Sequence, residues 1–411
     1  MTAHAAERTD VLTVYLVAAE ESGDRLGASL MQALAQKCAG RICFAGVGGH
    51  AMSAAGLTSL FPIDDLAIFG FTAIPRRLPM ILRRIGRAAN AIVTARPDAL
   101  VIIDSPDFTH RVARRVRAAV PGVPIVDYVS PSVWAWRPGR ARAMRAYVDH
   151  VLAILPFEPQ VHARLGGPPC TYVGHPLCEQ IAELRPGEAD ARRRLADPPL
   201  LLVLPGSRSS EIRRLLGPFA AATRLAQERY GPVELVMPTV PALAARLRDA
   251  TAGWPVHPRI VVEPGEKRAA FRQARAALAA SGTVTLELAL AGVPTVAAYR
   301  VGALEMALVR AAVRLQTDVK SVILANLVLG AQVVPEFLQG DCTAPALAAA
   351  LVPLLAETPE RRHQVEAFAR LDDIMGLPAE PSAKAADVIL GLIREARAAR
   401  LPDRANVLSA T

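Results

Sequence analysis

The stretch Val123-Pro-Ile-Val-Asp-Tyr-Val-Ser-Pro-Ser-Val-Trp-Ala-Trp-Arg137 joins two kinds of sequence. Its first half is a short apolar run typical of a buried β-strand. Its second half holds Ser130, Ser132, Trp134 and Trp136 around a proline, a mixture that does not suit a core strand. We therefore expect a loop at the carboxyl end of the strand, where open α/β sheets bind their ligands. A buried loop whose tryptophans only fill space is the alternative.

The same alternation of apolar strand and polar loop extends along the rest of the chain. In the N-terminal half, further strands are expected at residues 11–18, 42–47, 99–103, 151–155 and 171–173. A polar helical segment follows at 179–199. The second half then repeats the pattern, with strands expected at residues 200–204, 233–237, 260–262, 276–280 and 295–298. Strands that alternate with helices predict two mainly parallel α/β sheets.

The length and charge of the chain limit its architecture and its partners. Its 411 residues exceed what one hydrophobic core usually supports, so we expect two domains. The expected division is an α/β domain over 1–180, a second over 181–365, and C-terminal helices with a tail over 366–411, with packing of these helices back on the first domain as one option. The net charge of +9 favours an anionic partner such as a nucleotide, a phosphosugar or a phospholipid. Nucleic acid is disfavoured, because we find no zinc-finger spacing and no basic stretch interleaved with aromatics.

Cysteine, histidine and apolar patterns argue against several other classes. The five cysteines form no CxxC pair, and their odd number argues against a disulfide framework. Residues 1–10 lack the apolar core of a signal peptide, and the run 276–298 is interrupted by Glu287 and Pro294, so we expect a cytoplasmic protein without a membrane span. The histidines lack metal-binding spacing, and P-loop and GxGxxG motifs are absent. We therefore expect no metal and no cofactor.

Two loops of the N-terminal half place acidic residues directly after a strand. In Glu20-Glu-Ser-Gly-Asp24, Ser22 and the amides around Gly23 could hold an anion at a helix start. An ordinary turn capped by one of its polar side chains explains this loop equally well. Asp104-Ser-Pro-Asp107 offers two carboxylates, of which one can cap the next helix while the other acts as a general base. We favour Asp104 for chemistry because it lies nearer the strand end.

Two loops of the C-terminal half have the composition of phosphate-binding turns. In Pro205-Gly-Ser-Arg208, Gly206 permits close backbone approach, Ser207 donates, and the forked guanidinium of Arg208 can bind two diphosphate oxygens at once. In the second loop, small donors precede an acid that could accept from both hydroxyls of a ribose. Its candidate ligands are Ser281, Gly282, Thr283, Thr285 and Glu287. A plain turn and a capped helix are the respective alternatives.

Residues 70–93 place apolar side chains at helical spacing among arginines. A basic amphipathic helix of this kind fits a surface of anionic lipid. A helix that packs its apolar side on the sheet and leaves its arginines in water fits equally well. The candidate membrane residues are Phe71, Ile74, Leu78, Ile81, Leu82, Arg83 and Arg84.

Several of these motifs occur together in a characteristic order. The segments are AEESGD at 19–24, DSPDF at 104–108, YVSPSVWAWR at 128–137, LPFE at 155–158, VGHP at 173–176, LPGSR at 204–208 and SGTVTLE at 281–287. In this order and spacing the chain closely resembles the lipid-A-disaccharide synthases, a family of bacterial glycosyltransferases, from about residue 11 to at least residue 339. The aromatic segment is the most specific of these motifs, whereas LPGSR and SGTVTLE alone would not identify a family.

The resemblance implies a GT-B fold, in which two Rossmann-like α/β domains face each other across a cleft and the second holds most of the sugar nucleotide. It implies an inverting, metal-independent transfer of 2,3-diacylglucosamine from UDP to 2,3-diacylglucosamine 1-phosphate (lipid X). The products would be lipid A disaccharide 1-phosphate and UDP, in lipopolysaccharide biosynthesis. The family's essential aspartate falls on Asp104, its arginine on Arg208 and its asparagine on Asn326. The first domain would supply the acceptor and membrane side.

The sequence departs from the family pattern at Ala19, Glu21, Thr109 and Ala325, although none of these positions carries an expected catalytic group. The implied partners are UDP-diacylglucosamine, lipid X and the anionic cytoplasmic face of the bacterial inner membrane, and a homodimer is left open. A peptidoglycan-disaccharide transferase or a UDP-sugar epimerase would share the UDP site but lack the aromatic segment. A binding protein would not need both the arginine turn and the ribose-binding acid, and a dehydrogenase would need the missing glycine fingerprint.

Overall fold

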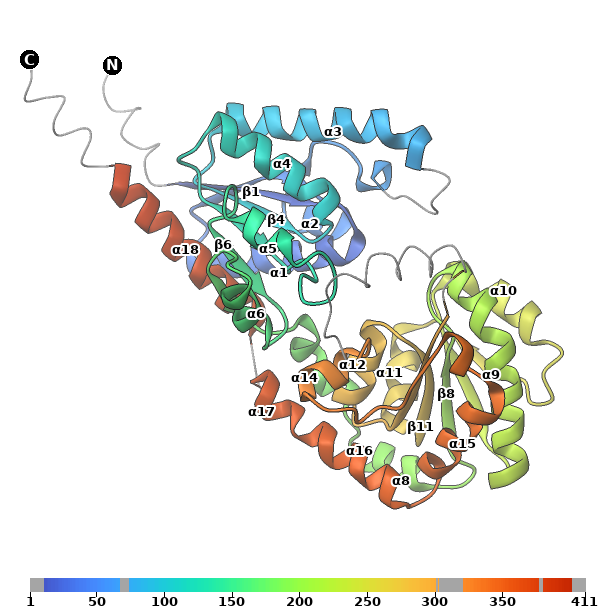
Figure 1. The fold of residues 1–411 in the computed structure, drawn as a ribbon. Coiled ribbons are helices and arrows are strands. Elements are labelled where there is room, and N and C mark those ends of the chain that lie inside the picture. The colour runs from blue at the N-terminus through green and yellow to red at the C-terminus, as the bar shows by residue number, and fades with distance from the viewer. Residues whose placement is uncertain (1–10, 67–73, 301, 303–320, 377–379, 401–411) are drawn as a thin grey trace, which may run out of the picture. The chain divides into compact units, whose positions relative to one another are not determined.

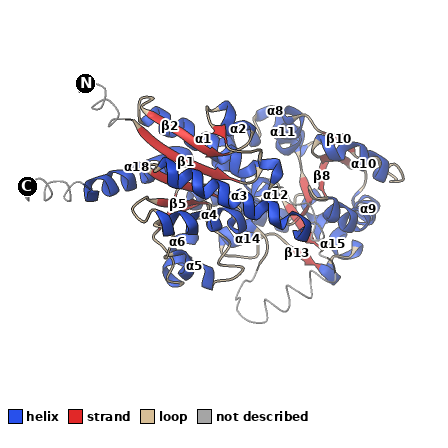
Figure 2. Cartoon of the chain, turned by 90° about the horizontal axis from the view of Figure 1, so that it is seen from above, coloured by secondary structure: helices blue, strands red, loops and turns tan. Residues whose placement is uncertain are grey.

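The computed structural model describes residues 11–66, 74–300, 302, 321–376 and 380–400. The chain divides into two compact units, one formed by Met1–Pro176 with Glu380–Thr411 and the other by Leu177–Ala379. Each unit contains one parallel β-sheet with helices on its faces (Figures 1 and 2). The α/β class predicted from the alternation of strands and helices is therefore confirmed.

The sheet of the first unit has the order β3-β2-β1-β4-β5-β6-β7, and all of its pairings are parallel. Its strands are β1 (Leu12–Ala18), β2 (Ile42–Val47), β3 (Thr58–Ser59), β4 (Ala99–Ile103), β5 (Ile125–Tyr128), β6 (His150–Ala153) and β7 (Cys170–Tyr172). Its helices are α1 (Glu21–Lys37), α2 (His50–Ala54), α3 (Ile74–Ala95), α4 (Pro106–Ala119), α5 (Gly139–Met144), α6 (Glu158–Arg164) and α18 (Pro381–Arg400). The strand order reverses between β1 and β4, which makes their carboxyl ends the topological switch point.

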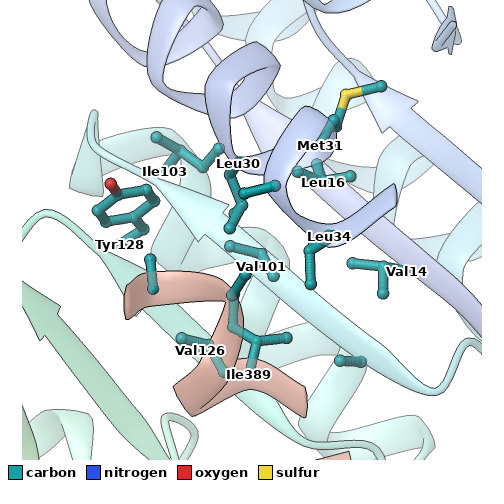
Figure 3. Packing of buried hydrophobic residues seen from close by; sticks show 14 of the residues in the cluster. Val14, Leu16, Leu30, Met31, Leu34, Val101, Ile103, Val126, Tyr128 and Ile389 are labelled. Carbon is teal, nitrogen blue, oxygen red and sulfur yellow. The ribbon is translucent and has the colours of Figure 1, made fainter. Parts of the chain in front are cut away.

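Alternate residues of the central strands supply two separate cores, as expected for a parallel sheet buried on both faces. Val14 and Leu16 of β1 pack with α1 and with Ile389 of α18 on one face (Figure 3). Tyr15 and Val17 pack with buried residues of α3 and α4 on the other face. The run of apolar residues in β1 therefore reflects burial of both faces.

Helix α18 belongs to the first unit although it follows the whole second unit in the chain. Ala385, Ala386 and Ile389 are fully buried against the core that α1 covers. Ion pairs from Lys37 to Asp387 (2.8 Å) and from Arg397 to Asp98 (2.8 Å) lie at its edges. The first unit is thus built from both ends of the chain.

The sheet of the second unit has the order β10-β9-β8-β11-β12-β13 and is also parallel. Its strands are β8 (Leu200–Leu204), β9 (Glu234–Pro238), β10 (Arg259–Val261), β11 (Ala276–Ala280), β12 (Thr295–Tyr299) and β13 (Glu336–Leu338). Its helices are α7 (Ile181–Leu184), α8 (Glu188–Leu195), α9 (Ser209–Tyr230), α10 (Pro241–Thr251), α11 (Pro264–Gln273), α12 (Thr283–Leu290), α14 (Leu324–Leu329), α15 (Ala344–Leu355), α16 (Pro359–Ala369) and α17 (Leu371–Met375). Its switch point lies between β8 and β11. The edge strands β3 and β13, of 2 and 3 residues, are too short to show a pattern and were not predicted.

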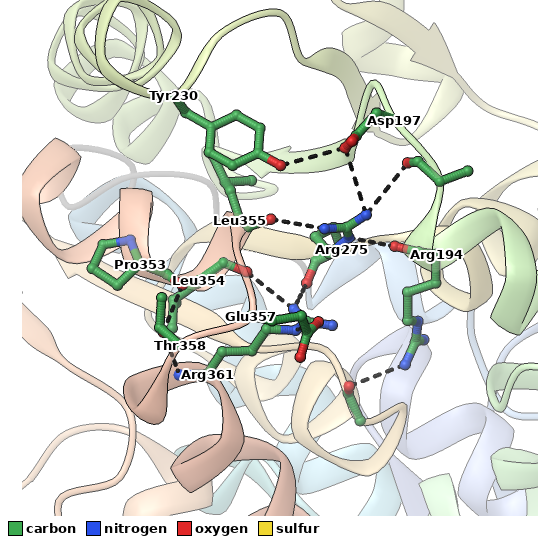
Figure 4. A network of polar contacts seen from close by, with 12 residues as sticks. Arg194, Asp197, Tyr230, Arg275, Pro353, Leu354, Leu355, Glu357, Thr358 and Arg361 are labelled. Atoms are coloured by element: carbon green, nitrogen blue, oxygen red, sulfur yellow. Dashed lines mark hydrogen bonds and ion pairs between the residues drawn. The ribbon is translucent and has the colours of Figure 1, made fainter.

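Three buried arginines, Arg194, Arg275 and Arg361, line the amino-terminal edge of the second sheet (Figure 4). Arg275 donates to the carbonyls of Arg194 (2.5 Å), Leu355 (2.9 Å) and Ala196 (3.4 Å). These carbonyls lie at the ends of α8 and α15, where the last turn of a helix has no internal donors. The positive charge also meets the negative end of each helix dipole.

The other two arginines repeat this arrangement. Arg194 donates to main-chain oxygens at or beyond the ends of α11 and α12, among them Phe271 (3.1 Å) and Gly292 (3.0 Å). Arg361 donates to the carbonyls of Arg275 (2.5 Å) and Leu354 (3.0 Å). Four helix ends therefore depend on three side chains.

We expect Arg275→Met to lower the free energy of unfolding by about 2–4 kcal/mol, because buried carbonyls lose their donors while the apolar stem is kept. Urea unfolding followed by circular dichroism measures this loss. Arg259→Met is the control, since that side chain is 52% exposed in its pair with Glu234, and its effect should stay within about 0.5 kcal/mol. Equal midpoints for the two variants would contradict the role of Arg275.

Candidate active site

Four polar loops flank the two switch points. In the first sheet, Glu20 follows β1 and Asp104 follows the neighbouring strand β4. In the second sheet, the loop with Arg208 follows β8 and the loop with Ser281 follows the neighbouring strand β11. Within each unit, two of the predicted loops therefore lie side by side at the carboxyl edge, where helix N-termini direct free amides and favour anions.

Asp104 occupies a strained backbone at the end of β4. Its φ is 51° and that of Ser105 is 45°, in the left-handed region that residues with side chains rarely adopt. The Asp104 amide donates to the Tyr128 carbonyl (3.0 Å), and Thr109 Oγ1 donates to the Asp104 carbonyl (2.7 Å). Strain of this kind costs about 1–3 kcal/mol per residue and clusters at functional sites.

The surroundings of Asp104 raise the pKa of its carboxyl. Burial is the main cause, and the negative charges of Glu20 and Asp127 add to it, while the Ser105 amide, which donates to Asp104 Oδ1 at 2.7 Å, opposes it. The Asp107 side chain is instead 85% exposed, with Arg140 3.4 Å away. A general base works best when its pKa lies near the working pH, so the half-buried carboxyl is the better candidate.

The first loop presents two of its expected ligands to solvent. Glu20 and Ser22 are exposed. Gly23 is buried, and a Cβ there would lie 3.4 Å from the Ile103 carbonyl oxygen. The start of α1 thus packs against the end of β4, and Glu20 lies near enough to Asp104 for its charge to act on that carboxyl.

Asp24, which we expected in the acceptor loop, uses its carboxylate for hydrogen bonds within the protein. Its side chain is 2% exposed and accepts from the amides of Gly49 (2.6 Å), Ala51 (2.8 Å) and Met52 (3.1 Å). These amides open α2, so Asp24 satisfies the N-terminus of a neighbouring helix. A cap supplied by another helix leaves no local sequence signal.

The aromatic loop, residues 129–137, follows β5, the neighbour of β4. Val129 has a φ of 81°, which is a marked outlier for a β-branched residue. Ser130 is buried and its Oγ lies 2.8 Å from His162 Nε2, whereas Ser132 is exposed. The contact with His162 thus helps to hold the loop in a backbone conformation that is unfavourable at Val129.

The two tryptophans of the aromatic loop have different environments. Trp134 is half-buried, and its ring meets Phe157 edge-on with centroids 5.5 Å apart. Trp136 is 40% exposed, and the guanidinium carbon of Arg137 lies 5.3 Å from its ring centroid. Trp136 is therefore the more exposed of the two indoles. The alternative in which the tryptophans only fill space applies in part to Trp134.

A buried polar cluster below this loop was not predicted. Glu158 and His162 on α6, Asp127 on β5 and His110 on α4 are each at most 4% exposed. His110 Nε2 lies 3.2 Å from Asp127 Oδ2. These residues come from separate elements, so their spacing in the sequence gave no signal, although Glu158 lies in the LPFE motif.

The loop after β8 is a turn between a strand and a helix, as the sequence predicts. Gly206 has a φ of 109°, and a Cβ there would lie 2.5 Å from Glu211 Oε2. The Arg208 amide donates to Glu211 Oε2 (3.3 Å), and Arg208 Nη1 lies 3.1 Å from Glu211 Oε1. With its side chain 79% exposed, the guanidinium lies in solvent at the start of α9, beside the exposed Ser207.

In the loop after β11, some of the expected donors bond within the protein and others are exposed. Gly282 and Thr283 are exposed, but Thr285 is buried and donates to the Gly282 carbonyl (2.8 Å). Ser281 Oγ donates to the Val322 carbonyl (3.2 Å). Glu287 is half-buried, and burial raises the pKa of its carboxyl. The surface donors are therefore Gly282 and Thr283 rather than Thr285.

Asn326 is buried within α14 and uses its whole amide on the protein. Nδ2 donates to the Val334 carbonyl (2.9 Å) and to Glu336 Oε1 (3.0 Å), and Oδ1 accepts from the amides of Val333 (2.9 Å) and Val334 (2.8 Å). This geometry shapes the chain between α14 and β13. A direct contact of Asn326 with substrate stays a prediction.

The expected membrane helix corresponds to α3, although Phe71 lies outside the described residues and nothing is described of the Ile74 side chain. Leu78 and Leu82 are 42% and 41% exposed. Ile81 packs at the edge of the core, where Ile85 is fully buried. Helix α3 therefore has a side that faces the core, as in the packing alternative, and also an exposed apolar edge, as in the membrane alternative.

The two candidate arginines of α3, Arg83 and Arg84, differ in their exposure and their partners. Arg83 is exposed, and its Nε donates to the Pro79 carbonyl (3.4 Å). Arg84 pairs with Asp65 and lies over the Phe61 ring, 4.7 Å from the centroid. No helix within the described residues is long and apolar enough to cross a membrane. Across the same residues, no cluster of three or more His, Cys, Asp or Glu has a geometry for a metal ion.

Comparison with known proteins gives one consistent family. A family model described as lipid-A-disaccharide synthetase matches residues 14–384. Lipid-A-disaccharide synthase from Rhodopseudomonas palustris strain BisB18 is 60% identical over 384 residues, covering 93% of this chain and 96% of the relative. The enzyme of the same name from Rhodospirillum centenum is 44% identical, covering 93% and 95%.

Solved structures with similar folds are distant in sequence. Acinetobacter baumannii MurG has a TM-score of 0.53 at 15% identity, covering 92% of this chain and 99% of that one. UDP-GlcNAc 2-epimerase from Neisseria meningitidis, solved with UDP-GlcNAc, has a TM-score of 0.58 at 10% identity, covering 93% and 99%. At this identity the likeness concerns the fold.

Asp104→Asn is expected to stabilise the protein at neutral pH. The pKa of the folded carboxyl is raised above its ordinary 3.8, so the folded state holds the proton more tightly and stability falls as pH rises through that window. The neutral amide keeps an oxygen for the Ser105 amide and removes this loss. Urea unfolding between pH 3 and 8 should show an advantage for the variant that grows as the pH rises above 3.8 and becomes constant once Asp104 is fully ionised in the folded state. Asp107→Asn is the exposed control, and equal stability of Asp104→Asn and wild type at pH 8 would refute the prediction.

Proposed function

Because the chain belongs to the lipid-A-disaccharide synthase family and is therefore a glycosyltransferase of lipid A biosynthesis, we propose that it joins UDP-2,3-diacylglucosamine to 2,3-diacylglucosamine 1-phosphate. The observation that carries the detailed assignment is the pairing of polar loops at both switch points. The second unit takes the sugar nucleotide. The first unit takes the acceptor and supplies the base.

The diphosphate of the donor is bound where α9 and α12 begin. Both helices start at neighbouring strands, so their free amides and positive dipole ends serve one anion. The exposed guanidinium of Arg208 adds a forked donor, and Gly282 and Thr283 add donors of the second loop. Glu287, half-buried one turn further along α12, accepts from the ribose hydroxyls.

The transfer is a single displacement with inversion. Asp104 removes the proton from the 6-hydroxyl of the acceptor while that oxygen bonds to the anomeric carbon and the bond from this carbon to the UDP oxygen breaks. Negative charge then grows on the diphosphate, where Arg208 and the helix amides stabilise it. The raised pKa of Asp104 supports its role as the base. Asn326 contributes by shaping the segment that meets the loop after β11.

Both substrates carry acyl chains, so we place the enzyme peripherally on the cytoplasmic face of the inner membrane. Leu78 and Leu82 of α3 supply exposed apolar area, and Arg83 beside them supplies positive charge for anionic headgroups. Ile81 belongs to the core side of the helix and is left out of this surface.

With UDP-2,3-diacylglucosamine and lipid X, the wild-type protein should release UDP and form the disaccharide, both measured by mass spectrometry. Asp104→Asn should lower turnover by about 10²–10⁴-fold while UDP binding persists, because a positioned base contributes that much. The control, Asp107→Asn, should turn over normally. Loss of turnover in the control instead would move the base to Asp107, and no product from wild type would refute the substrates.

Replacing Leu78 and Leu82 together with serine should weaken binding to phosphatidylglycerol-containing vesicles roughly tenfold or more, since two exposed apolar side chains are lost. Leu195→Ser is the control, because that leucine is 61% exposed on α8 of the other unit. Sedimentation with vesicles measures binding, and UDP binding checks the fold. Added salt should weaken wild-type binding only partly, because apolar insertion is not screened. Unchanged vesicle binding by the double variant would place the docking surface elsewhere.

A further inference from the structure

Helix α6 contacts the aromatic loop at two points. His162 Nε2 lies 2.8 Å from Ser130 Oγ near the start of the loop. Glu158 Oε1 accepts from the indole nitrogen of Trp134 (3.4 Å) in the middle of the loop. Both α6 side chains are almost fully buried, at 0% and 2% exposure. The two contacts lie one helical turn apart, so a single rigid element determines where both parts of the loop lie.

The loop needs such support because its backbone is unfavourable at both ends. Val129 has a φ of 81° and Arg137 a φ of 52°. Neither residue is glycine, and positive φ persists only where the surrounding contacts determine it. Phe157, the residue before Glu158, packs edge-on against Trp134 and strengthens the attachment.

We propose that Glu158 and His162 are positioning residues which hold the aromatic loop in the shape that receives the acceptor sugar. The identity of the acceptor rests on the proposed function, whereas the attachment of the loop rests on the contacts alone. Trp134 is held from below, while Trp136 stays exposed beside Arg137. The loop thus offers an exposed indole face and a cation. It leaves β5, the neighbour of the strand β4 that precedes Asp104.

The environment of Glu158 makes this attachment sensitive to pH. Burial raises the pKa of its carboxyl to about 7, the Asp127 charge on β5 adds to this, and the Leu155 amide (3.0 Å) and Trp134 oppose it. On the neighbouring strand β7, the Cys170 thiol is close enough to feel the charges of both Glu158 and Asp127.

The remaining groups of the cluster are histidines. His162 on α6 has a pKa lowered by burial, and His110 on α4 lies against Asp127 rather than Glu158. Above pH 7 the Trp134 N–H therefore meets a carboxylate, which accepts more strongly than a neutral carboxyl.

Tryptophan fluorescence tests the attachment without any substrate. Wild-type emission should change with a midpoint near pH 7, and the change should be absent in Glu158→Gln, which keeps the shape but cannot ionise, and in Trp134→Phe. Trp136→Phe should retain it, because that indole does not contact Glu158. A flat wild-type titration, or a transition that persists in Glu158→Gln, would overturn the proposal.

Kinetics then separate positioning from stability. In wild type the KM for the acceptor should rise roughly tenfold as pH falls from 8 to 6, while the KM for the sugar nucleotide stays constant. Glu158→Gln should show a high acceptor KM that no longer depends on pH. Ser130→Ala should raise the acceptor KM at every pH without moving the fluorescence midpoint.

The outcomes distinguish this proposal from the proposed function. Equal effects on both KM values, or none on the acceptor KM, would show that the contacts only stabilise the fold and would overturn the positioning role. If wild type shows the fluorescence transition but uses neither substrate, the attachment stands and the assigned reaction fails. If the reaction proceeds but the fluorescence transition is missing, the assigned reaction stands and the proposed attachment fails.

Discussion

The direction of the helices in each parallel sheet is the constraint on which the rest of the structure depends. Every crossover helix runs opposite to its strands, so helix C-termini gather at one edge and N-termini at the other. At the first edge of the second unit, carbonyls without internal donors are satisfied by Arg194, Arg275 and Arg361. Buried protein cations serve that edge, whereas the helix N-termini at the opposite edge carry the positive ends of the dipoles, which favour an anion.

The same constraint explains where backbone strain occurs. Asp104 and Val129 end neighbouring strands β4 and β5, and both have positive φ without being glycine. At these points the chain must turn sharply from a buried strand into a loop that carries polar side chains. The sheet and its two cores hold the strand ends, and surrounding contacts of this kind allow unfavourable turns to persist.

The sequence was sufficient for the positions of the strands other than the short edge strands β3 and β13, and for the loops that follow the central strands. Buried parallel strands such as β1, β4 and β8 are continuous apolar runs, and the loops after them are rich in Gly, Ser and Asp. The sequence could not show how individual side chains are used. Asp24 caps α2, and Thr285 donates to the Gly282 carbonyl at the start of its own helix, although each is a residue type that could bind a ligand. Glu158 and His162 were missed because their partners come from a loop whose path only the fold determines.

The return of α18 to the first unit has a consequence for how the chain folds during its synthesis. The second unit is one continuous segment, Leu177–Ala379, and all of its strands have left the ribosome before α18 is made. The first unit must wait, because the core that α1 covers is completed by Ile389 and Ile393. Domains usually fold in the order in which they emerge. In this protein the segment that emerges second can complete its fold first, and the first unit acquires its full core only after the whole second unit and α18 have been made.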